Sequence, residues 1–399
     1  MCTIVRIERA FFPIAAVAFA LEAALFSTLS AMLPQFESEF GMSTLASGVL
    51  AGCYTAGMVL AILVTGLWAG DRFGVRATSL AGCVLLALAS VAFGAANDVV
   101  TLDVARTVQG VGAGLLWYSL LNWLILIVPP ARRGSTLGAA LGASVFGTAA
   151  GPLLGAATQV VGTFVVFAGV AAVVLLFAAV LQRAPAPTRV EGEPSTSRLR
   201  LPPDTQLRLM AAIAFVPPLV ISAVLTIVPL QLVARGASEL GVDAALLAGA
   251  LLAAICCPKA GRISDRRGAL APVVFGGVIS VATLAAMAAS HSPLMLSIGF
   301  VLFEGIGLSF FWIPIISLFT ERGEAVGIGA ATAALTINLT FTVASTVGPP
   351  LLSALEQLTT EAAPYLAMAA TCLLTLAVIV RRRSYAARPA EIPAGEVAG

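Results

Sequence analysis

The sequence contains little charge and almost no histidine. Only 11% of its 399 residues are charged, and His291 is the single histidine. Because a soluble domain carries about 25% charged residues, a chain this apolar has too little polar surface to remain dispersed in water. The sequence also lacks a nucleophile–base set and a metal-ligand cluster. These absences exclude a soluble protein and argue against an enzyme, a cofactor and a metal site.

Two further absences narrow the possible functions. The chain has no GxxxxGK[ST] phosphate loop, which argues against an ATP-driven pump. Its six cysteines fall mostly within apolar stretches, and their spacing suits neither a disulfide framework nor a metal site. The net charge of +2 gives no indication of nucleic-acid binding. We therefore expect no nucleic-acid partner.

Hydrophobic residues, in contrast, make up 59% of the chain. They form runs long enough to cross a hydrocarbon core about 30 Å thick, and the runs are continuous, whereas barrel strands alternate. We therefore predict an all-α integral membrane protein with twelve transmembrane helices. The expected spans begin near Phe11, Leu45, Arg76, Val99, Ser135, Gly162, Leu207, Val242, Pro272, Pro293, Glu324 and Thr359.

Basic residues indicate the orientation of these spans. Lysine and arginine concentrate before the first span, in every second loop and after the last span, and only Arg235 falls in an opposite loop. Because positive residues mark the cytoplasmic side, we predict a multi-pass protein of the cell (inner or plasma) membrane with both termini in the cytoplasm. The first apolar run contains Glu22 and no clear cleavage site, so we expect a retained helix and not a signal peptide.

The two halves of the chain repeat each other on either side of a polar segment. Residues 183–206 are rich in Pro, Ser, Glu and Arg, a composition typical of a linker without a core. Gly110 and Trp117 recur 195 residues later as Gly305 and Trp312. A repeat of six spans is typical of transporters, whose substrate site lies between the halves. We predict four segments: an N-terminal six-helix bundle (1–182), a cytoplasmic linker (183–206), a C-terminal six-helix bundle (207–383) and a disordered cytoplasmic tail (384–399).

Three sequence motifs point to one family. They are the loop Gly66-Leu-Trp-Ala-Gly-Asp71-Arg72-Phe-Gly74-Val-Arg76 with its second-half copy Gly261-Arg-Ile-Ser-Asp265-Arg266-Arg-Gly268, the helix segment Arg106-Thr-Val-Gln109-Gly110-Val-Gly112, and the segment Gly147-Thr-Ala-Ala-Gly151-Pro152-Leu-Leu-Gly155. With these motifs the chain resembles the major facilitator superfamily over nearly its full length, and looks most like its twelve-helix drug:proton antiporters. The resemblance implies two pseudo-repeated bundles, a monomer, and transport of a small molecule by alternating access.

The resemblance also suggests roles for the loop and for the fifth helix. In the family, the aspartate that matches Asp71 latches the cytoplasmic ends of the two bundles, and we expect this gating role at Asp71 and at its repeat Asp265. Gly74 and Gly268 would supply tight turns. A solvated loop pair worth little energy is the alternative. The fifth-helix motif is associated with antiport in the family, and close packing of its small residues is the alternative.

Glu22, Asp103 and Arg106 are the candidate proton-coupling residues. A carboxylate at the centre of the first span is costly, so it should face a cavity or a partner. Asp103, Arg106 and Gln109 are three residues apart and share one face of the fourth span, where Arg106 could pair with Asp103. In the resembled family the matching arginine is linked to proton transfer. A structural hydrogen bond at Glu22 and a static ion pair at Arg106 are the alternatives. The second-half equivalent of Glu22 is Pro217, which suggests that the main proton site lies in the first half only.

Glu22, Gln109, Trp117, Glu304 and Trp312 are the candidate residues of a substrate cavity. Glu304 stands where the repeat has Gln109, and it could bind a cationic group, hold a second proton or be structural. Aromatic rings can hold flat apolar or cationic compounds, and the two tryptophans recur at equivalent positions. Tryptophan also anchors membrane interfaces, which is the alternative.

These features favour one function. We predict proton-coupled efflux, in which protons and a small lipophilic or cationic compound move in opposite directions as two halves rock around a central cavity. Proton-coupled uptake or facilitated exchange of a small metabolite by the same fold is the alternative. The expected partners are the small-molecule substrate, protons and the lipid bilayer.

Overall fold

The computed structural model describes residues 2–65, 70–128, 130–184, 204–328 and 330–381, and these residues form a helical protein. The helices are α1 (Cys2–Phe40), α2 (Thr44–Val64), α3 (Gly70–Gly94), α4 (Val99–Ile127), α5 (Pro130–Val161), α6 (Thr163–Gln182), α7 (Thr205–Ala234), α8 (Glu239–Arg267), α9 (Leu270–Ala288), α10 (Pro293–Leu302), the π-helical turn η2 (Phe303–Leu308), α11 (Ser309–Ala325), α12 (Ala330–Leu358) and α13 (Ala363–Arg381). α10, η2 and α11 together make one span. Within the described residues, twelve helical spans are long and apolar enough to cross a membrane, which confirms the predicted fold class.

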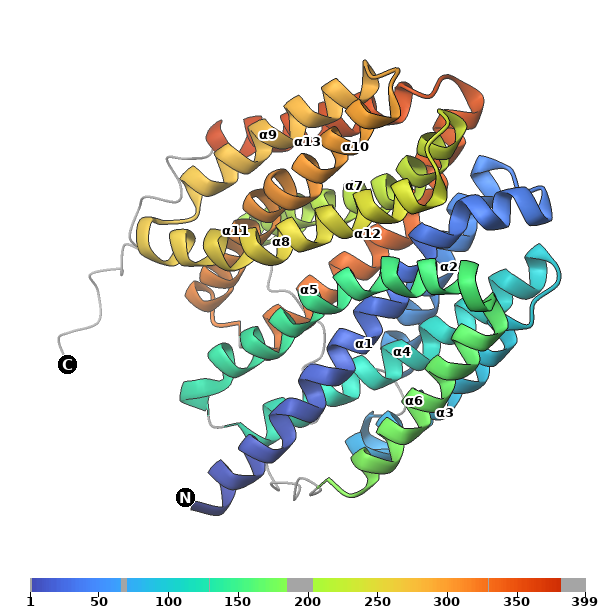
Figure 1. The fold of residues 1–399 in the computed structure, drawn as a ribbon. Helices are drawn as coiled ribbons and strands as arrows, with labels where there is room; N and C mark the ends of the chain where they lie inside the picture. Colours follow the sequence, from blue (N-terminus) through green and yellow to red (C-terminus); the bar gives the residue numbers. More distant parts are fainter. Residues whose placement is uncertain (1, 66–69, 129, 185–203, 329, 382–399) are drawn as a thin grey trace.

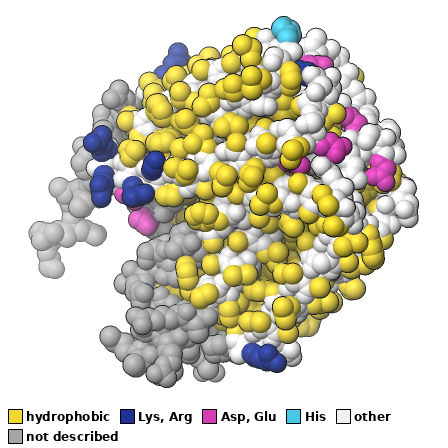
Figure 2. All heavy atoms as spheres, viewed as in Figure 1, with side chains coloured by type: hydrophobic (Ala, Val, Ile, Leu, Met, Phe, Trp, Pro, Cys, Tyr) yellow, Lys and Arg dark blue, Asp and Glu magenta, His cyan; other side chains and the backbone are white. Residues whose placement is uncertain are grey.

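The outer wall of the protein is apolar. Hydrophobic side chains cover most of the face shown in Figure 2, and Leu88, Leu176 and Leu374 are among the large ones that are exposed. In water such a surface would drive aggregation, whereas in a bilayer it faces lipid of similar polarity. Every backbone polar group in such a span must be satisfied within the helix, which is why the lipid-facing wall is built from continuous helices.

Two bundles make up the fold, one from α1 to α6 and one from α7 to α13 (Figure 1). Each bundle has its own cluster of buried apolar side chains. The pairings repeat, since α1 packs on α5 as α7 packs on α12, and α3 packs on α6 as α9 packs on α13. The start of α1 and the end of α13 lie toward the same end of the molecule in Figure 1.

The glycines that repeat in sequence also occupy equivalent places in the two bundles. Gly110 of α4 lies against the backbone of Tyr54 on α2, and Gly305 lies against Leu252 on α8. Side chains on these glycines would collide with the neighbouring helix. The sequence repeat is therefore a packing repeat, because glycine lets the helices approach closely at these two crossings.

The bundles contact each other toward the end that holds most acidic side chains. Two hydrogen bonds between the bundles lie there among the described residues, Leu45 N to Gln357 Oε1 (3.1 Å) and Gln159 Nε2 to Asp243 Oδ2 (3.4 Å). A third, Thr346 Oγ1 to Thr55 Oγ1 (3.1 Å), lies near the middle of α2 and α12. Most of the basic side chains visible in Figure 2 gather toward the opposite end. Among the described residues, the two ends thus differ in charge and in the hydrogen bonds that join the bundles.

Some predicted boundaries are wrong. The eleventh span was expected near Glu324, but α11 continues through Ala325 and α12 begins at Ala330, because Gly327, with φ of 80°, makes the turn between them. The last span was expected near Thr359, but α13 begins at Ala363. The linker and the tail stay predictions, because most of their residues lie outside the described part of the chain.

Candidate functional site

Arg106 of α4 is the centre of a buried polar site in the first bundle. Its side chain is 1% exposed, and it donates hydrogen bonds to the backbone carbonyls of Leu25 (3.0 Å) and Phe26 (3.1 Å) on α1 and to Gln109 Oε1 (3.1 Å). Its guanidinium also lies 4.4 Å from the centre of the Tyr54 ring, a distance at which a cation is attracted to the ring face. These contacts offset the cost of burying a charge that arginine cannot shed.

Glu22 on α1 lies beside this arginine. Its side chain is buried, and its carboxylate interacts electrostatically with Arg106 and faces the Tyr54 hydroxyl. That hydroxyl is buried and falls short of hydrogen-bond geometry with a described partner. No ion pair of the described residues joins Glu22 to Arg106, but the structure places both side chains in one buried site across α1 and α4, with Tyr54 of α2 as the third member.

Asp103 does not form the predicted pair with Arg106. Among the described residues, no ion pair joins the two, and Asp103 Oδ1 is buried without a hydrogen-bond partner. Asp103 instead interacts with the Cys53 thiol on α2. Helical spacing placed both side chains on one face, but Arg106 extends to the carbonyls of α1, which sequence spacing could not reveal.

Gln109 belongs to the Arg106 site and not to an open cavity. Its side chain is completely buried, accepts from Arg106 and donates to Ser90 Oγ at 3.1 Å. Trp117 is also packed, with its ring centroid 4.4 Å from that of Phe19. Trp312 is only partly buried, and its centroid lies 6.3 Å from that of Phe341 on α12.

Glu304 occupies a different environment in the second bundle. It lies on η2, is 5% exposed, and its Oε2 has no hydrogen-bond partner. This oxygen lies against Gly249 of α8, where a Cβ would collide with it. Isolated π-helical turns occur frequently at functional sites, yet no charged group of the described residues pairs with this carboxylate.

The gating loops are described only in part. Gly66 and the side chains of Asp71 and Arg72 lie outside the described part of the structure. The two predicted tight turns are present at Gly74 and Gly268, with φ of 72° and 81°.

Other residues of these loops are placed at the same end of the bundles. Arg76 donates a hydrogen bond to the carbonyl of Ala184, which ties α3 to the end of α6. Gly261, Asp265 and Arg266 lie at the end of α8, and the last two are exposed.

The fifth-helix motif packs α5 on α1. Gly147, Gly151 and Gly155 all face α1, and a Cβ at Gly151 would collide with the Ser27 side chain. Pro152 lies within the continuous helix α5. The motif therefore sets a close approach between α5 and the helix that carries Glu22.

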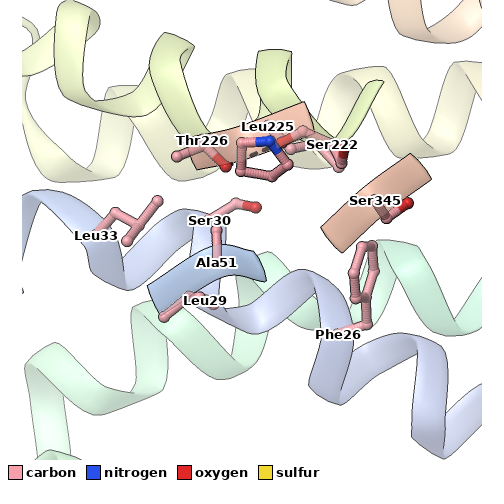
Figure 3. A pocket seen from close by; sticks show the side chains of 10 residues that line it. Phe26, Leu29, Ser30, Leu33, Ala51, Ser222, Leu225, Thr226 and Ser345 are labelled. Atoms are coloured by element: carbon pink, nitrogen blue, oxygen red, sulfur yellow. Dashed lines mark hydrogen bonds between the residues drawn. The ribbon is translucent and has the colours of Figure 1, made fainter. Parts of the chain in front are cut away.

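A pocket lies between the two bundles, one helical turn beyond Glu22. It is formed by α1, α2, α7 and α12, and the ring of Phe26 points toward Ser345 in Figure 3. Its lining residues are Phe26, Leu29, Ser30, Leu33, Ala51, Ser222, Leu225, Thr226, Ser345 and Pro349. All of them are uncharged, and four carry hydroxyl groups.

Sequence reasoning missed Tyr54, Phe26, Phe341 and Ser345. None carries a charge, so none drew attention in an apolar span. One signal was present for Tyr54: the repeat offset of 195 places it opposite Gly249, so a large aromatic residue in one half corresponds to no side chain in the other.

Comparison with known proteins identifies similar chains. The sequence matches the profile of the Major Facilitator Superfamily over residues 15–340. It is 36% identical over 151 residues to the tetracenomycin C resistance and export protein of Streptomyces glaucescens, covering 35% of this chain and 28% of that protein. It is 31% identical over 131 residues to the uncharacterised MFS-type transporter YhcA of Bacillus subtilis, covering 32% and 24%. The matched regions thus span about a quarter of these relatives.

Solved structures share the fold. The human organic anion transporter MFSD10 (TETRAN) superposes with a TM-score of 0.71 at 17% identity, over 93% of this chain and 99% of that one. A bacterial homologue of the human lysosomal transporter Spinster, in an inward-facing and unoccupied conformation, superposes with a TM-score of 0.69 at 13% identity, over 95% and 96%. At these identities the similarity concerns the fold alone.

Proposed function

Because this chain belongs to the major facilitator superfamily and is a multi-pass membrane transporter, we propose that it couples proton entry to the export of small lipophilic or cationic compounds. Transporters of this fold are not enzymes, so the carboxylates serve ion and substrate binding. The observation that carries the proposal is the placement of the buried Glu22 within electrostatic range of Arg106, one helical turn from a pocket between the bundles. The name of the tetracenomycin resistance and export relative supports the direction of transport.

Two opposing influences on Glu22 suit it to proton coupling. Burial disfavours a charged carboxylate, whereas the nearby Arg106 guanidinium favours it. Movement of α1 relative to α4, or entry of water, changes the balance between them. A carboxylate whose proton affinity depends on conformation can bind a proton from one side and release it to the other.

The contacts between the bundles indicate the access state. The positive-inside rule assigns the basic end, with both termini, to the cytoplasm. The acidic end, where Leu45 bonds to Gln357 and Gln159 to Asp243, then faces outward and is closed. We infer that this conformation admits substrate from the cytoplasm, and that Asp71 helps to latch the cytoplasmic ends in the opposite state.

Inverted membrane vesicles test this proposal. A panel of fluorescent probes, including ethidium and the neutral 1,8-dihydroxyanthraquinone, is added to vesicles with an acidified lumen, and probe accumulation and lumenal pH are recorded together. Antiport predicts that a transported probe accumulates while protons leave the lumen. Movement of both in the same direction would instead establish the uptake alternative.

Variants of α1 make the test specific. Glu22→Gln keeps the size of the side chain but removes its titratable group, so it should abolish probe-dependent proton release while the protein still inserts in the membrane. Glu39→Gln changes an exposed carboxylate of the same helix and serves as the matched control. Normal coupling in Glu22→Gln would remove Glu22 from the mechanism.

A further inference from the structure

The pocket between the bundles contains hydroxyl groups that lack partners. Ser345 is 1% exposed and its Oγ has no hydrogen-bond partner. Ser30, on the opposite bundle, makes no hydrogen bond within the described residues. Ser222 and Thr226 donate to the carbonyls of Leu219 and of Ser222, so their oxygens can still accept. A buried hydroxyl without a partner costs free energy, and a ligand with hydrogen-bonding groups would remove that cost.

The same pocket offers no net charge to a cation. No lining residue is ionisable. Glu22 is the carboxylate one helical turn away, and it already interacts electrostatically with Arg106, which keeps its positive charge. Glu304 lies against Gly249 of α8 and does not line the pocket. A cationic group entering here would lose its hydration without gaining an unpaired counter-charge.

A row of aromatic rings crosses between the bundles beside the pocket. The ring centroid of Phe26 lies 6.0 Å from that of Tyr54 and 6.3 Å from that of Phe341, and Phe341 lies 6.3 Å from Trp312. The Phe26–Phe341 contact is an edge-to-face pair that joins α1 of one bundle to α12 of the other. Movement of one bundle against the other changes this pair directly, and the ring of a ligand could replace either member at similar separations.

From these observations we propose that this pocket binds a neutral, ring-bearing substrate that carries hydroxyl or carbonyl groups. Phe26 of the pocket lining contacts the ring, which takes the place of the neighbouring Phe341 against it, and Ser30 and Ser345 bond the substrate oxygens. The proposal rests on the proposed export function and narrows its substrate class. Substrate would then be sensed where the bundles meet, and Phe26 lies on the helix that carries Glu22. Occupation of the pocket and protonation of Glu22 therefore act on the same helix.

Binding to the purified full-length protein tests this assignment without a proton gradient. Tryptophan fluorescence is titrated with 1,8-dihydroxyanthraquinone, a neutral ring system with hydroxyl and carbonyl oxygens, and with ethidium, a planar cation; detergent alone gives the blank. We expect the anthraquinone to bind at least tenfold more tightly than ethidium. Equal affinities, tighter binding of ethidium, or no binding of the anthraquinone would overturn the proposal.

Variants of α12 identify the site. Ser345→Ala removes one hydrogen bond and should weaken anthraquinone binding about three- to tenfold. Ser353→Ala is the matched control, because Ser353 is a buried, unpartnered hydroxyl of the same helix that faces Gly48 and not the pocket. Ser345→Asp places a carboxylate in the pocket and should reverse the preference toward ethidium. Equal effects of Ser345→Ala and Ser353→Ala would contradict the assignment.

The binding and transport experiments can fail separately. Selective anthraquinone binding without any probe-dependent proton movement would leave the pocket assigned and refute proton-coupled export. Proton-coupled export of ethidium, with no preference for the neutral probe, would support export and refute the neutral pocket.

Discussion

The two bundles share a backbone plan but differ in their buried charge. At three positions separated by 195 residues, the first bundle has Tyr54, Arg106 and Gln109, whereas the second has Gly249, Val301 and Glu304. In the first, the guanidinium makes hydrogen bonds to α1 and Gln109 and lies over a ring. In the second, a lone carboxylate lies against a glycine. Among the described residues, the same helix crossings thus hold a partnered arginine in one bundle and a carboxylate without an ion-pair partner in the other.

This difference indicates which bundle can couple protons to transport. For the proton affinity of a carboxylate to depend on conformation, its distance from a charged partner has to change, and the charged neighbour of Glu22 is Arg106 on a different helix. Glu304 has no such partner among the described residues, and its bundle has proline at the position equivalent to Glu22. We therefore propose that proton coupling resides in the first bundle.

Replacing Arg106 should produce the largest effect. Arg106→Lys keeps the charge but loses the planar group that bonds two carbonyls of α1 and Gln109. With hydrogen bonds to a charged group worth about 1.5–3 kcal/mol each, we expect turnover to fall about 100-fold, measured as transport per folded protein. Val301→Ala, at the equivalent position of the second bundle, should leave turnover within about twofold. Unchanged turnover in Arg106→Lys would favour a purely structural arginine.

Replacing the repeated glycines with alanine should reduce the stability of the protein by an intermediate amount, which differs between the two bundles. A Cβ at Gly110 would lie 1.8 Å from the Tyr54 carbonyl oxygen, whereas the atoms nearest a Cβ at Gly305 belong to the Leu252 side chain, at 2.4–2.6 Å. We expect Gly110→Ala to destabilise the protein by about 1–3 kcal/mol, because backbone cannot move aside. Alanine gains about 1 kcal/mol of helix propensity over glycine at either position, so the smaller loss of stability that we expect for Gly305→Ala comes from the leucine side chain, which can rearrange where backbone cannot. Thermal unfolding in detergent measures both, and a larger loss at Gly305 would contradict the comparison.

The smallest effect concerns the basic end of the bundles. In the second bundle Arg322 Nη2 lies 2.6 Å from Asp204 Oδ2, and this hydrogen bond to Arg322 lowers the pKa of Asp204 below its ordinary value of 3.8. Because the pKa is lower in the folded than in the unfolded state, the stabilisation is present above about pH 4 and is lost as pH falls through the folded value. The pair is partly exposed, so we expect no more than about 1 kcal/mol.

Thermal unfolding at about pH 7 and about pH 3 checks this pair. Asp204→Asn should lower stability at the higher pH and have little effect at the lower one. Arg76→Gln provides the comparison in the first bundle, since the partner of Arg76 is the carbonyl of Ala184, which does not titrate. Its effect should be the same at both pH values. If Asp204→Asn lost the same stability at both pH values, the charge of Asp204 would not contribute to the stability of the fold.

Much of the fold could be predicted from the sequence, but less of the site. Continuous apolar runs fix the spans because hydrocarbon thickness sets their length, and the repeated Gly110 and Gly305 mark helix crossings. The prediction of an Arg106–Asp103 pair was wrong because helical spacing relates residues of one helix only. The carbonyl of Leu25, to which Arg106 donates, belongs to another helix. The π-helical turn at Glu304 leaves no pattern in sequence.

The pocket was beyond sequence reasoning for a related reason. Serine, threonine and phenylalanine are ordinary residues of membrane helices, so Ser345 and Phe341 become notable only when four helices converge. The lack of a hydrogen-bond partner at Ser345 is likewise a tertiary property. Charged residues are easily recognised in an apolar sequence because they are rare there. A site built from uncharged residues has no such signal.

The central claim is that the titratable group of the first bundle, and not that of the second, couples protons to transport. The most direct measurement reconstitutes Glu22→Gln and Glu304→Gln in liposomes, and compares probe accumulation driven by a pH gradient with probe counterflow in its absence. Glu22→Gln should lose gradient-driven accumulation and keep counterflow, whereas Glu304→Gln should keep both. Retained accumulation in Glu22→Gln, together with its loss in Glu304→Gln, would contradict the account.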